Sequence, residues 1–201
     1  MQSQTWVGFI TMRAESGAGR RAQRMAAVAF VTALTAAAAQ VSIPLPFTPV
    51  PFTFQPMVVL VGAAALGSRL GMASQIAYLA LGIIGLPVFA ASPMLPQGVA
   101  RLFGPTGGYL MAYPVAAFVA GSLAERGLDR RYLTSVFAMA CGLVVVFAAG
   151  ALWLGFVAQP ALGLAGAFAA GVAPFVLADI AKLFVAAAVM PALWRLVGRP
   201  D

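Results

Sequence analysis

The chain has 201 residues, of which 62% are hydrophobic and only 8% are charged, and its mean hydropathy is +0.96. Soluble domains contain roughly 25% charged residues, so this composition excludes an ordinary soluble protein and indicates a polytopic membrane protein. The formal charge of +7 does not indicate nucleic-acid binding, because the arginines form clusters between apolar runs. With one cysteine, Cys141, and no histidine, we expect no disulfide, metal site or cofactor.

Apolar runs bounded by Pro, Gly and Arg predict an all-α fold, with six transmembrane helices in one bundle. A span needs about 20 apolar residues, so six spans and short loops account for the chain length. The second predicted span is short, and we expect adjoining non-helical chain to be buried against protein. The predicted spans cover residues 25–43, 54–67, 72–88, 107–124, 133–157 and 174–194.

The basic residues predict the orientation of the bundle, since cytoplasmic loops of membrane proteins carry an excess of Lys and Arg. Of the 12 basic residues, all except Arg101 and Lys182 fall on one face of the predicted topology. Both termini are therefore predicted to lie in the cytoplasm. Residues 1–24 form a basic cytoplasmic segment, loosely ordered or containing a short interfacial helix, ahead of a six-helix domain at residues 25–199.

Small residues recur along the first predicted span. Ala29, Ala33 and Ala37 are spaced four apart, which places them on one face of a helix. Small residues on one stripe allow another membrane helix to approach closely, so this stripe is a candidate docking surface for a partner protein. Alanine is abundant in the chain, so a chance stripe is the alternative.

Two long connections lie on the face opposite the arginines. Residues 43–52 contain a proline at nearly every second position and cannot be helical, so we expect a stiff, extended strap similar to polyproline. Residues 87–103 form a second long loop, and loops of this length in compact proteins are usually functional or disordered. We expect the two loops to roof one cavity.

Few polar side chains occur in this part of the chain. Arg101 is the only basic residue on the outer face, and it is a candidate for pairing with an anionic solute; the alternative is a solvated loop arginine. Gln55, Gln75 and Tyr78 lie in or beside the second and third spans, where polar groups commonly make helix contacts. We keep Gln55 and Tyr78 as candidate ligand contacts.

Residues 104–109 read Gly-Pro-Thr-Gly-Gly-Tyr and open the fourth predicted span. Thr106 is a candidate helix cap, while Gly107 and Gly108 would let backbone N–H groups at a helix start approach a ligand. Tyr109 completes this candidate binding segment. The alternative is a glycine-rich turn that allows tight helix packing. The segment is neither a P-loop nor a dinucleotide fingerprint, so phosphate transfer is not indicated.

An acid and a base stand three residues apart within the last apolar run. Asp179 is the only acid inside a predicted span, and Lys182 is the only lysine of the chain. Their spacing places both on one helix face, where they can pair. A charge at mid-bilayer costs on the order of 2.5–3.5 kcal/mol, so we predict that the pair faces a cavity and binds a polar solute. The alternative is an ion pair that only packs helices.

The remaining acids are predicted to lie in loops or tails on the arginine-rich side; they are Glu15, Glu125, Asp129 and Asp201.

Together these motifs resemble the BioY family, the biotin-binding substrate-specific component of energy-coupling-factor vitamin transporters. The resemblance runs through most of the chain after Arg24. Four segments carry it, in the family's order: IPLPFTPVPFTFQ (residues 43–55), GLP (85–87), GPTGGY (104–109) and DIAK (179–182). Ahead of GPTGGY the family places an arginine in a glycine-rich segment; residues 94–98 lack it here, and Arg101 follows.

The resemblance implies a six-helix bundle in the bacterial cytoplasmic membrane that captures biotin near the outer surface. It also implies assembly with a transmembrane coupling protein and two ATPase subunits. In the family the alanine-rich first helix is the coupling face, which corresponds here to Ala29, Ala33 and Ala37. Biotin, membrane lipid and these protein subunits are thus the expected partners.

A secondary carrier and an enzyme are the two alternatives to a biotin-binding transporter component. A proton-coupled secondary carrier, solitary or homo-oligomeric, could use one acid and one lysine to move biotin or another small carboxylate vitamin, but the sequence shows no convincing inverted repeat. Histidine-dependent hydrolases and metalloproteases are excluded by the lack of histidine, and aspartyl proteases by the single intramembrane acid. We therefore predict a transport protein and not an enzyme.

Overall fold

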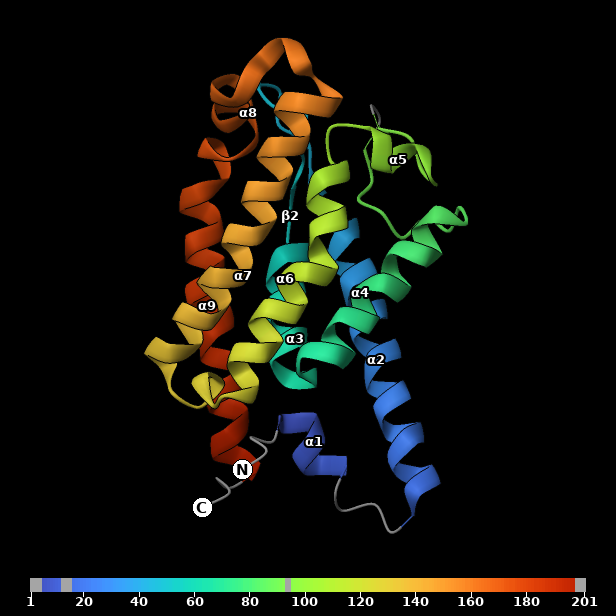
Figure 1. Ribbon diagram of the computed structural model, residues 1–201, viewed down its shortest axis with the longest axis vertical. Coiled ribbons are helices and arrows are strands. Elements are labelled where there is room, and N and C mark those ends of the chain that lie inside the picture. Colours follow the sequence, from blue (N-terminus) through green and yellow to red (C-terminus); the bar gives the residue numbers. More distant parts are fainter. Residues whose placement is uncertain (1–4, 12–15, 93–94, 198–201) are drawn as a thin grey trace.

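The computed structural model describes residues 5–11, 16–92 and 95–197, and it is an all-α bundle with one short β-hairpin (Figure 1). In chain order its elements are α1 (Trp6–Thr11), α2 (Gly17–Gln40), β1 (Ser42–Ile43), β2 (Phe52–Thr53), α3 (Gln55–Leu66), α4 (Ser68–Ile83), α5 (Ala100–Phe103), α6 (Gly107–Glu125), η1 (Leu128–Arg130), α7 (Tyr132–Trp153), η2 (Leu154–Ala158), η3 (Pro160–Leu162), α8 (Gly163–Gly171) and α9 (Ala173–Val197).

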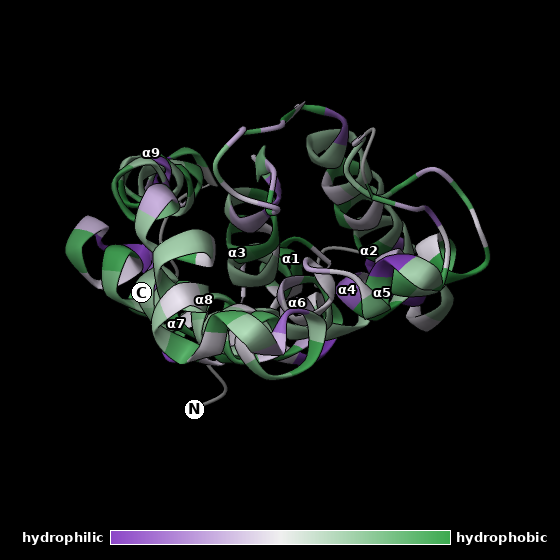
Figure 2. Cartoon of the chain, turned by 90° about the horizontal axis from the view of Figure 1, so that it is seen from above, coloured by the Kyte–Doolittle hydropathy of each residue, from purple (hydrophilic) through white to green (hydrophobic). Residues whose placement is uncertain are grey.

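The helices form two layers, which are visible from above in Figure 2. One layer contains α2, α3 and α9, and the other contains α4, α6 and α7; α6 packs against α3, α4 and α7. The face of α6 that contacts its neighbours is built from small residues, including Ala112, Ala116 and Ala120, all almost fully buried. Small side chains let the helix backbones approach closely, which gives membrane helices their van der Waals contacts.

Among the described residues, four helical stretches are long and apolar enough to cross a membrane: Gly17–Gln40, Gly107–Glu125, Tyr132–Ala158 and Pro160–Leu196. Helices α3 and α4 have 12 and 16 residues. At 1.5 Å per residue they measure about 18 and about 24 Å, less than the hydrocarbon thickness of about 30 Å. The expectation that the second span is short is thus met, while the count of six spans stays a prediction.

The spans predicted at 107–124, 133–157 and 174–194 agree closely with α6, α7 plus η2, and α9. Helix α2 instead begins at Gly17, because the Ser16 side chain accepts a hydrogen bond from Gly19 N and caps it.

Helix α4 covers Ser68–Ile83, not residues 72–88. The left-handed backbone of Gly67, with φ of 86°, turns the chain directly from α3 into α4. The segment after α7, which falls between two predicted spans, contains α8.

The segment at residues 43–52 is non-helical, as predicted, but it is not an extended strap. It folds back on itself, so that β1 and β2 pair antiparallel with Ser42 opposite Thr53 and Ile43 opposite Phe52. Proline lacks the N–H that a β-ladder needs, which limits the pairing to these residues. The predicted strap is therefore a hairpin with a proline-rich tip.

The two ends of the bundle differ in charge. We call the end with the β1–β2 hairpin, α5 and α8 the hairpin end, and the opposite end, with α1, η1 and the last turn of α9, the arginine end (Figure 1). Apart from Arg101, the arginines of the described part lie in or next to elements at the arginine end. The short helix α1, one of the alternatives predicted for residues 1–24, crosses below α3 at this end.

Candidate ligand-binding site

Asp179 and Lys182 form the predicted pair on α9. Lys182 Nζ lies 2.7 Å from Asp179 Oδ1, and the two side chains are 10% and 8% exposed for the lysine and the aspartate. Nζ also donates to Thr53 O at 2.7 Å and lies 3.4 Å from the ring centroid of Phe52. Lys182 therefore ties α9 to strand β2, and a carboxylate, a carbonyl and an aromatic face together compensate its charge.

A cavity of about 50 Å³ lies next to this pair. Asp179 lines it but Lys182 does not, and Asp179 Oδ2 accepts no hydrogen bond from the part of the chain that the structure describes. Both outer loops contribute, as the sequence predicted. The lining residues are Val50, Pro51, Thr53, Gln55, Pro56, Ala90, Arg101, Thr106, Tyr109, Leu110, Tyr113, Val146, Phe147, Gly171, Phe175 and Asp179. A mostly apolar wall with few polar groups is typical of small-molecule sites.

Arg101 lines the cavity and is only 1% exposed, so it is not a solvated loop arginine. Its Nη2 donates to Ala90 O at 2.6 Å, and Nη1 donates to Leu95 O at 3.2 Å and to Pro96 O at 3.3 Å. Burial lowers the pKa of Arg101, but an arginine starts high enough to keep its charge at neutral pH. Arg101 thus holds the second outer loop together, with Nε left unpaired among the described residues.

Only some residues of the Gly-Pro-Thr-Gly-Gly-Tyr segment line the cavity. Thr106 and Tyr109 line the cavity, whereas Gly107 and Gly108 do not. A methyl group on Gly107 would overlap Leu102 O, and one on Gly108 would overlap Trp153 Cβ, so these glycines serve helix packing. Their predicted backbone approach to a ligand is therefore not supported by the cavity wall and stays a prediction.

Thr106 occupies the N-cap position of α6, but its side chain does not cap the helix as predicted. Its Oγ1 is buried without a partner in the described ranges. Tyr109 Oη donates to Gly171 O at 2.8 Å and thereby joins α6 to the end of α8.

The candidate contacts Gln55 and Tyr78 hold each other. Gln55 Nε2 donates to Tyr78 Oη at 2.6 Å, and Tyr78 Oη donates to Val88 O at 3.1 Å. Gln55 lines the cavity, whereas Tyr78 does not line it and is fully buried. Gln75 bonds to Thr35 Oγ1 and lies outside the cavity, as a helix contact would.

The sequence was compared with known protein families and proteins. The chain matches the model of the BioY family over residues 10–199. It belongs to the BioY family. It is 40% identical to the probable biotin transporter BioY of Pyrococcus horikoshii over 162 residues, covering 81% of this chain and 90% of that one. It is also 40% identical to the biotin transporter BioY of Thermotoga maritima over 166 residues, covering 82% and 92% of the two chains.

The fold is shared with a solved structure. The crystal structure of the S-component for biotin from an ECF-type ABC transporter superposes with a TM-score of 0.79 at 27% identity, over 90% of this chain and 95% of that chain. The resemblance predicted from four short segments is therefore confirmed at the level of the family. As a BioY member with long apolar helices, the chain is a multi-pass membrane protein.

The alanine stripe of this BioY chain lies on the surface. Ala29, Ala33 and Ala37 are all exposed, whereas Val31 and Thr35 on the neighbouring face of α2 are buried. The stripe is thus accessible to another helix, as a docking surface requires.

Sequence reasoning missed several residues of the cavity wall. Tyr113 and Phe175 line the cavity, and each lies one helical turn from a predicted residue, Tyr109 and Asp179 respectively. The i, i+4 spacing was the signal that could have found them. Val146 and Phe147 on α7 carry no such signal, because that helix contains no predicted site residue.

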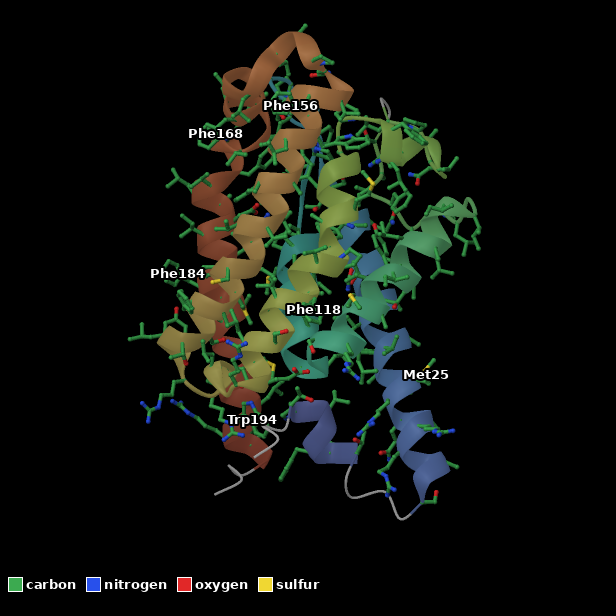
Figure 3. The ribbon with its side chains drawn as sticks, in the orientation of Figure 1. Met25, Phe118, Phe156, Phe168, Phe184 and Trp194 are labelled. Atoms are coloured by element: carbon green, nitrogen blue, oxygen red, sulfur yellow. The ribbon has the colours of Figure 1, made fainter. Side chains whose placement is uncertain are left out.

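A second buried acid lies far from the cavity, at the arginine end. Asp129, predicted as a loop residue, is 2% exposed, and its Oδ2 accepts a hydrogen bond of 2.6 Å from Nε1 of Trp194 near the end of α9 (Figure 3). Burial raises the pKa of Asp129, while the bond from Trp194 and the charge of Arg130 oppose that rise.

Glu125, the last residue of α6, accepts hydrogen bonds from Ser68 N and Oγ at the start of α4. Glu15 and Asp201 lie outside the described residues.

Proposed function

We propose that this protein captures biotin at the hairpin end and delivers it across the cytoplasmic membrane as the substrate-specific component of an energy-coupling-factor transporter. One observation carries the proposal: a BioY chain places a buried carboxylate, Asp179, in an apolar cavity under two outer loops. The biotin transporters and the S-component for biotin among its relatives support the choice of solute.

The groups of the cavity suit the chemistry of biotin, which has a carboxylate, a ureido group and an apolar thioether ring. Asp179 Oδ2 can accept an N–H group, and the unpaired hydroxyl of Thr106 can donate or accept. The aromatic walls at Phe147 and Phe175 can cover the apolar ring. No bond of the solute is made or broken, so the protein acts by binding and release.

Lys182 takes a different role from the one predicted. Its Nζ donates hydrogen bonds to Asp179 Oδ1 and to Thr53 O, and Lys182 does not line the cavity. We therefore assign it as a positioning residue that orients the carboxylate of Asp179 and holds strand β2 against α9.

Both outer loops close over the cavity. Its volume of about 50 Å³ is well below the several hundred Å³ typical of small-molecule sites. The hairpin is held by Lys182 through Thr53 O, and the second loop is held by Arg101 through Ala90 O. A solute of biotin's size therefore enters only when one or both loops move outward.

The distribution of basic residues gives the proposed transporter its orientation in the membrane. Six spans, with α3 and α4 as short ones completed by the hairpin and the second loop, place both termini in the cytoplasm. The exposed stripe of Ala29, Ala33 and Ala37 then faces the membrane, where the coupling protein would dock and connect the bundle to two ATPase subunits.

Calorimetric titration of the detergent-purified protein with biotin and desthiobiotin tests the proposal. We expect tight biotin binding, and we expect Asp179→Asn to abolish it, because the neutral amide is a weaker acceptor than the carboxylate and leaves the charge of Lys182 uncompensated. Asp129→Asn, a matched change of a buried acid away from the cavity, should keep biotin affinity.

Full affinity in the Asp179 variant would overturn the site. Uptake that persists without ATPase subunits and collapses with the proton gradient would assign a secondary carrier instead.

A further inference from the structure

A second concave surface lies outside the proposed biotin site. It is a groove of about 370 Å³ that runs over α3 between α2 and α9 and is lined only by apolar residues and Trp6. Figure 2 shows α2 and α9 on either side of α3, so that one face of α3 is left uncovered by helices. Val58, Val61 and Ala65 of α3 line this groove. An open apolar channel of this kind in a membrane suits a hydrocarbon chain.

On α2, the apolar residues that line the groove are followed by basic residues toward the arginine end. Ala27, Val31 and Leu34 line the groove. Arg24 and Arg20 lie three and seven residues before Ala27, hence on the same face of the helix, one and two turns closer to the arginine end. Both are exposed. At the arginine end of the groove, the apolar surface of α2 is therefore followed by the two positively charged side chains.

Helix α1 places a hydrogen-bond donor at the same end. Trp6 lines the groove, and its Nε1 is buried without an acceptor in the described part of the chain. The position of α1 is fixed by Val7, which packs with Val31 and Leu66. Tryptophan is enriched at the membrane interface because its ring is apolar and its N–H can reach a headgroup or ester oxygen.

We propose that this groove binds one anionic glycerophospholipid from the leaflet at the arginine end. An acyl chain lies over α3, an ester oxygen accepts from Trp6 Nε1, and the phosphate pairs with Arg20 and Arg24. The charge decides between a lipid and an apolar helix as the occupant, because only the lipid brings an anion to the arginines. The site does not depend on biotin, since it shares no residue with the cavity.

Native mass spectrometry of the full chain in detergent, titrated with phosphatidylglycerol or phosphatidylcholine of the same acyl chains, tests this site. We expect one phosphatidylglycerol to bind in preference to phosphatidylcholine. Arg24→Gln should weaken phosphatidylglycerol binding about fivefold, the contribution typical of one basic residue at an anionic headgroup. Arg21→Gln is the matched control: it shares a helix face with Met25, which points away from the bundle (Figure 3), and should change nothing.

A second variant separates the chain from the headgroup. Val61→Phe fills the groove without burying charge, and it should weaken the binding of both lipids. Equal binding of the two lipids by the unmodified protein, equal losses from the two arginine variants, or unchanged binding in Val61→Phe would overturn the proposal. Biotin titration of each variant verifies that the bundle is folded.

Discussion

At the scale of single residues, the site depends on how each charge is compensated. Asp179, Lys182 and Arg101 are all largely withdrawn from solvent, and the two bases bond to carbonyl oxygens of the outer loops. A buried ion pair adds little stability over apolar side chains, so its use here is better explained by binding and by loop positioning. Asp179 is the residue of the pair that a solute can reach.

Lys182→Met tests the positioning role. Removing one partner of a buried ion pair leaves the other uncompensated and costs about 3–5 kcal/mol, so the variant should unfold at lower temperature and lose biotin affinity. The double variant Asp179→Asn/Lys182→Met should recover thermal stability but not binding. Thermal unfolding and calorimetry in detergent give both readouts; a single variant with normal stability and normal affinity would contradict the assignment.

Asp129 makes stability depend on pH in the opposite sense from an ordinary paired carboxylate. Its pKa in the folded protein is raised above the usual value of 3.8, so the folded state binds the proton more tightly than the unfolded chain. The stabilisation is fully present below the unfolded pKa and is lost as pH rises through the folded one. Asp129→Asn, which keeps an acceptor for Trp194, should remove this dependence and raise the unfolding temperature at neutral pH.

Comparison of unfolding temperatures between pH 4 and pH 8 measures that effect. Parallel pH profiles of the variant and the unmodified protein would show that Asp129 is not responsible.

At the scale of elements, each helix is fitted to a task by its length and its small residues. Helices α3 and α4 are short, and the hairpin and second outer loop occupy the space beyond them, where the cavity forms. Gly107 and Gly108 allow α6 to contact the Leu102 backbone and Trp153, which brings Thr106 and Tyr109 to the cavity wall. The glycines therefore act on the site through packing.

The exposed alanine stripe of α2 is tested by bulk. Ala33→Leu should impair biotin uptake by cells, because a larger side chain keeps a partner helix at a distance, while biotin affinity of the purified protein stays unchanged. Ala148→Leu, at an exposed alanine of α7, is the matched control and should affect neither measurement. An equal loss of uptake and affinity in Ala33→Leu would argue against docking.

At the scale of the whole molecule, the charge asymmetry of the two-layer bundle predicts its orientation in the membrane. Apart from Arg101, the described arginines lie at one end, and Arg101 is buried by loop carbonyls at the other. The cavity proposed for biotin and the groove proposed for lipid are separate surfaces, one under the outer loops and one between α2 and α9. The bundle can therefore bind its solute and its surrounding lipid independently.

The orientation predicts accessibility from each side of the membrane. In a chain whose Cys141 is replaced by Ala, Gln159→Cys at the hairpin end should react with a membrane-impermeant maleimide in intact cells. Arg131→Cys at the arginine end should react only after the cells are opened. Labelling of both positions in intact cells, or the reverse pattern, would contradict cytoplasmic termini.

The sequence alone determined the membrane class, the long helices, the non-helical segment after α2 and the family. It also determined the pairing of Asp179 with Lys182. These features depend on composition, on periodicity within one segment and on spacings of a few residues, all of which are local properties of the chain.

Only the tertiary structure decided which side chains meet. Thr53 and Lys182 bond across 129 positions of the sequence, and Tyr109 and Gly171 across 62. Local pattern does not specify such contacts, because they depend on how separate helices pack and how the outer loops fold back. For this reason the structure places Asp179 in the cavity wall and Lys182 outside it, buries Arg101, and turns Gly107 and Gly108 toward packing contacts.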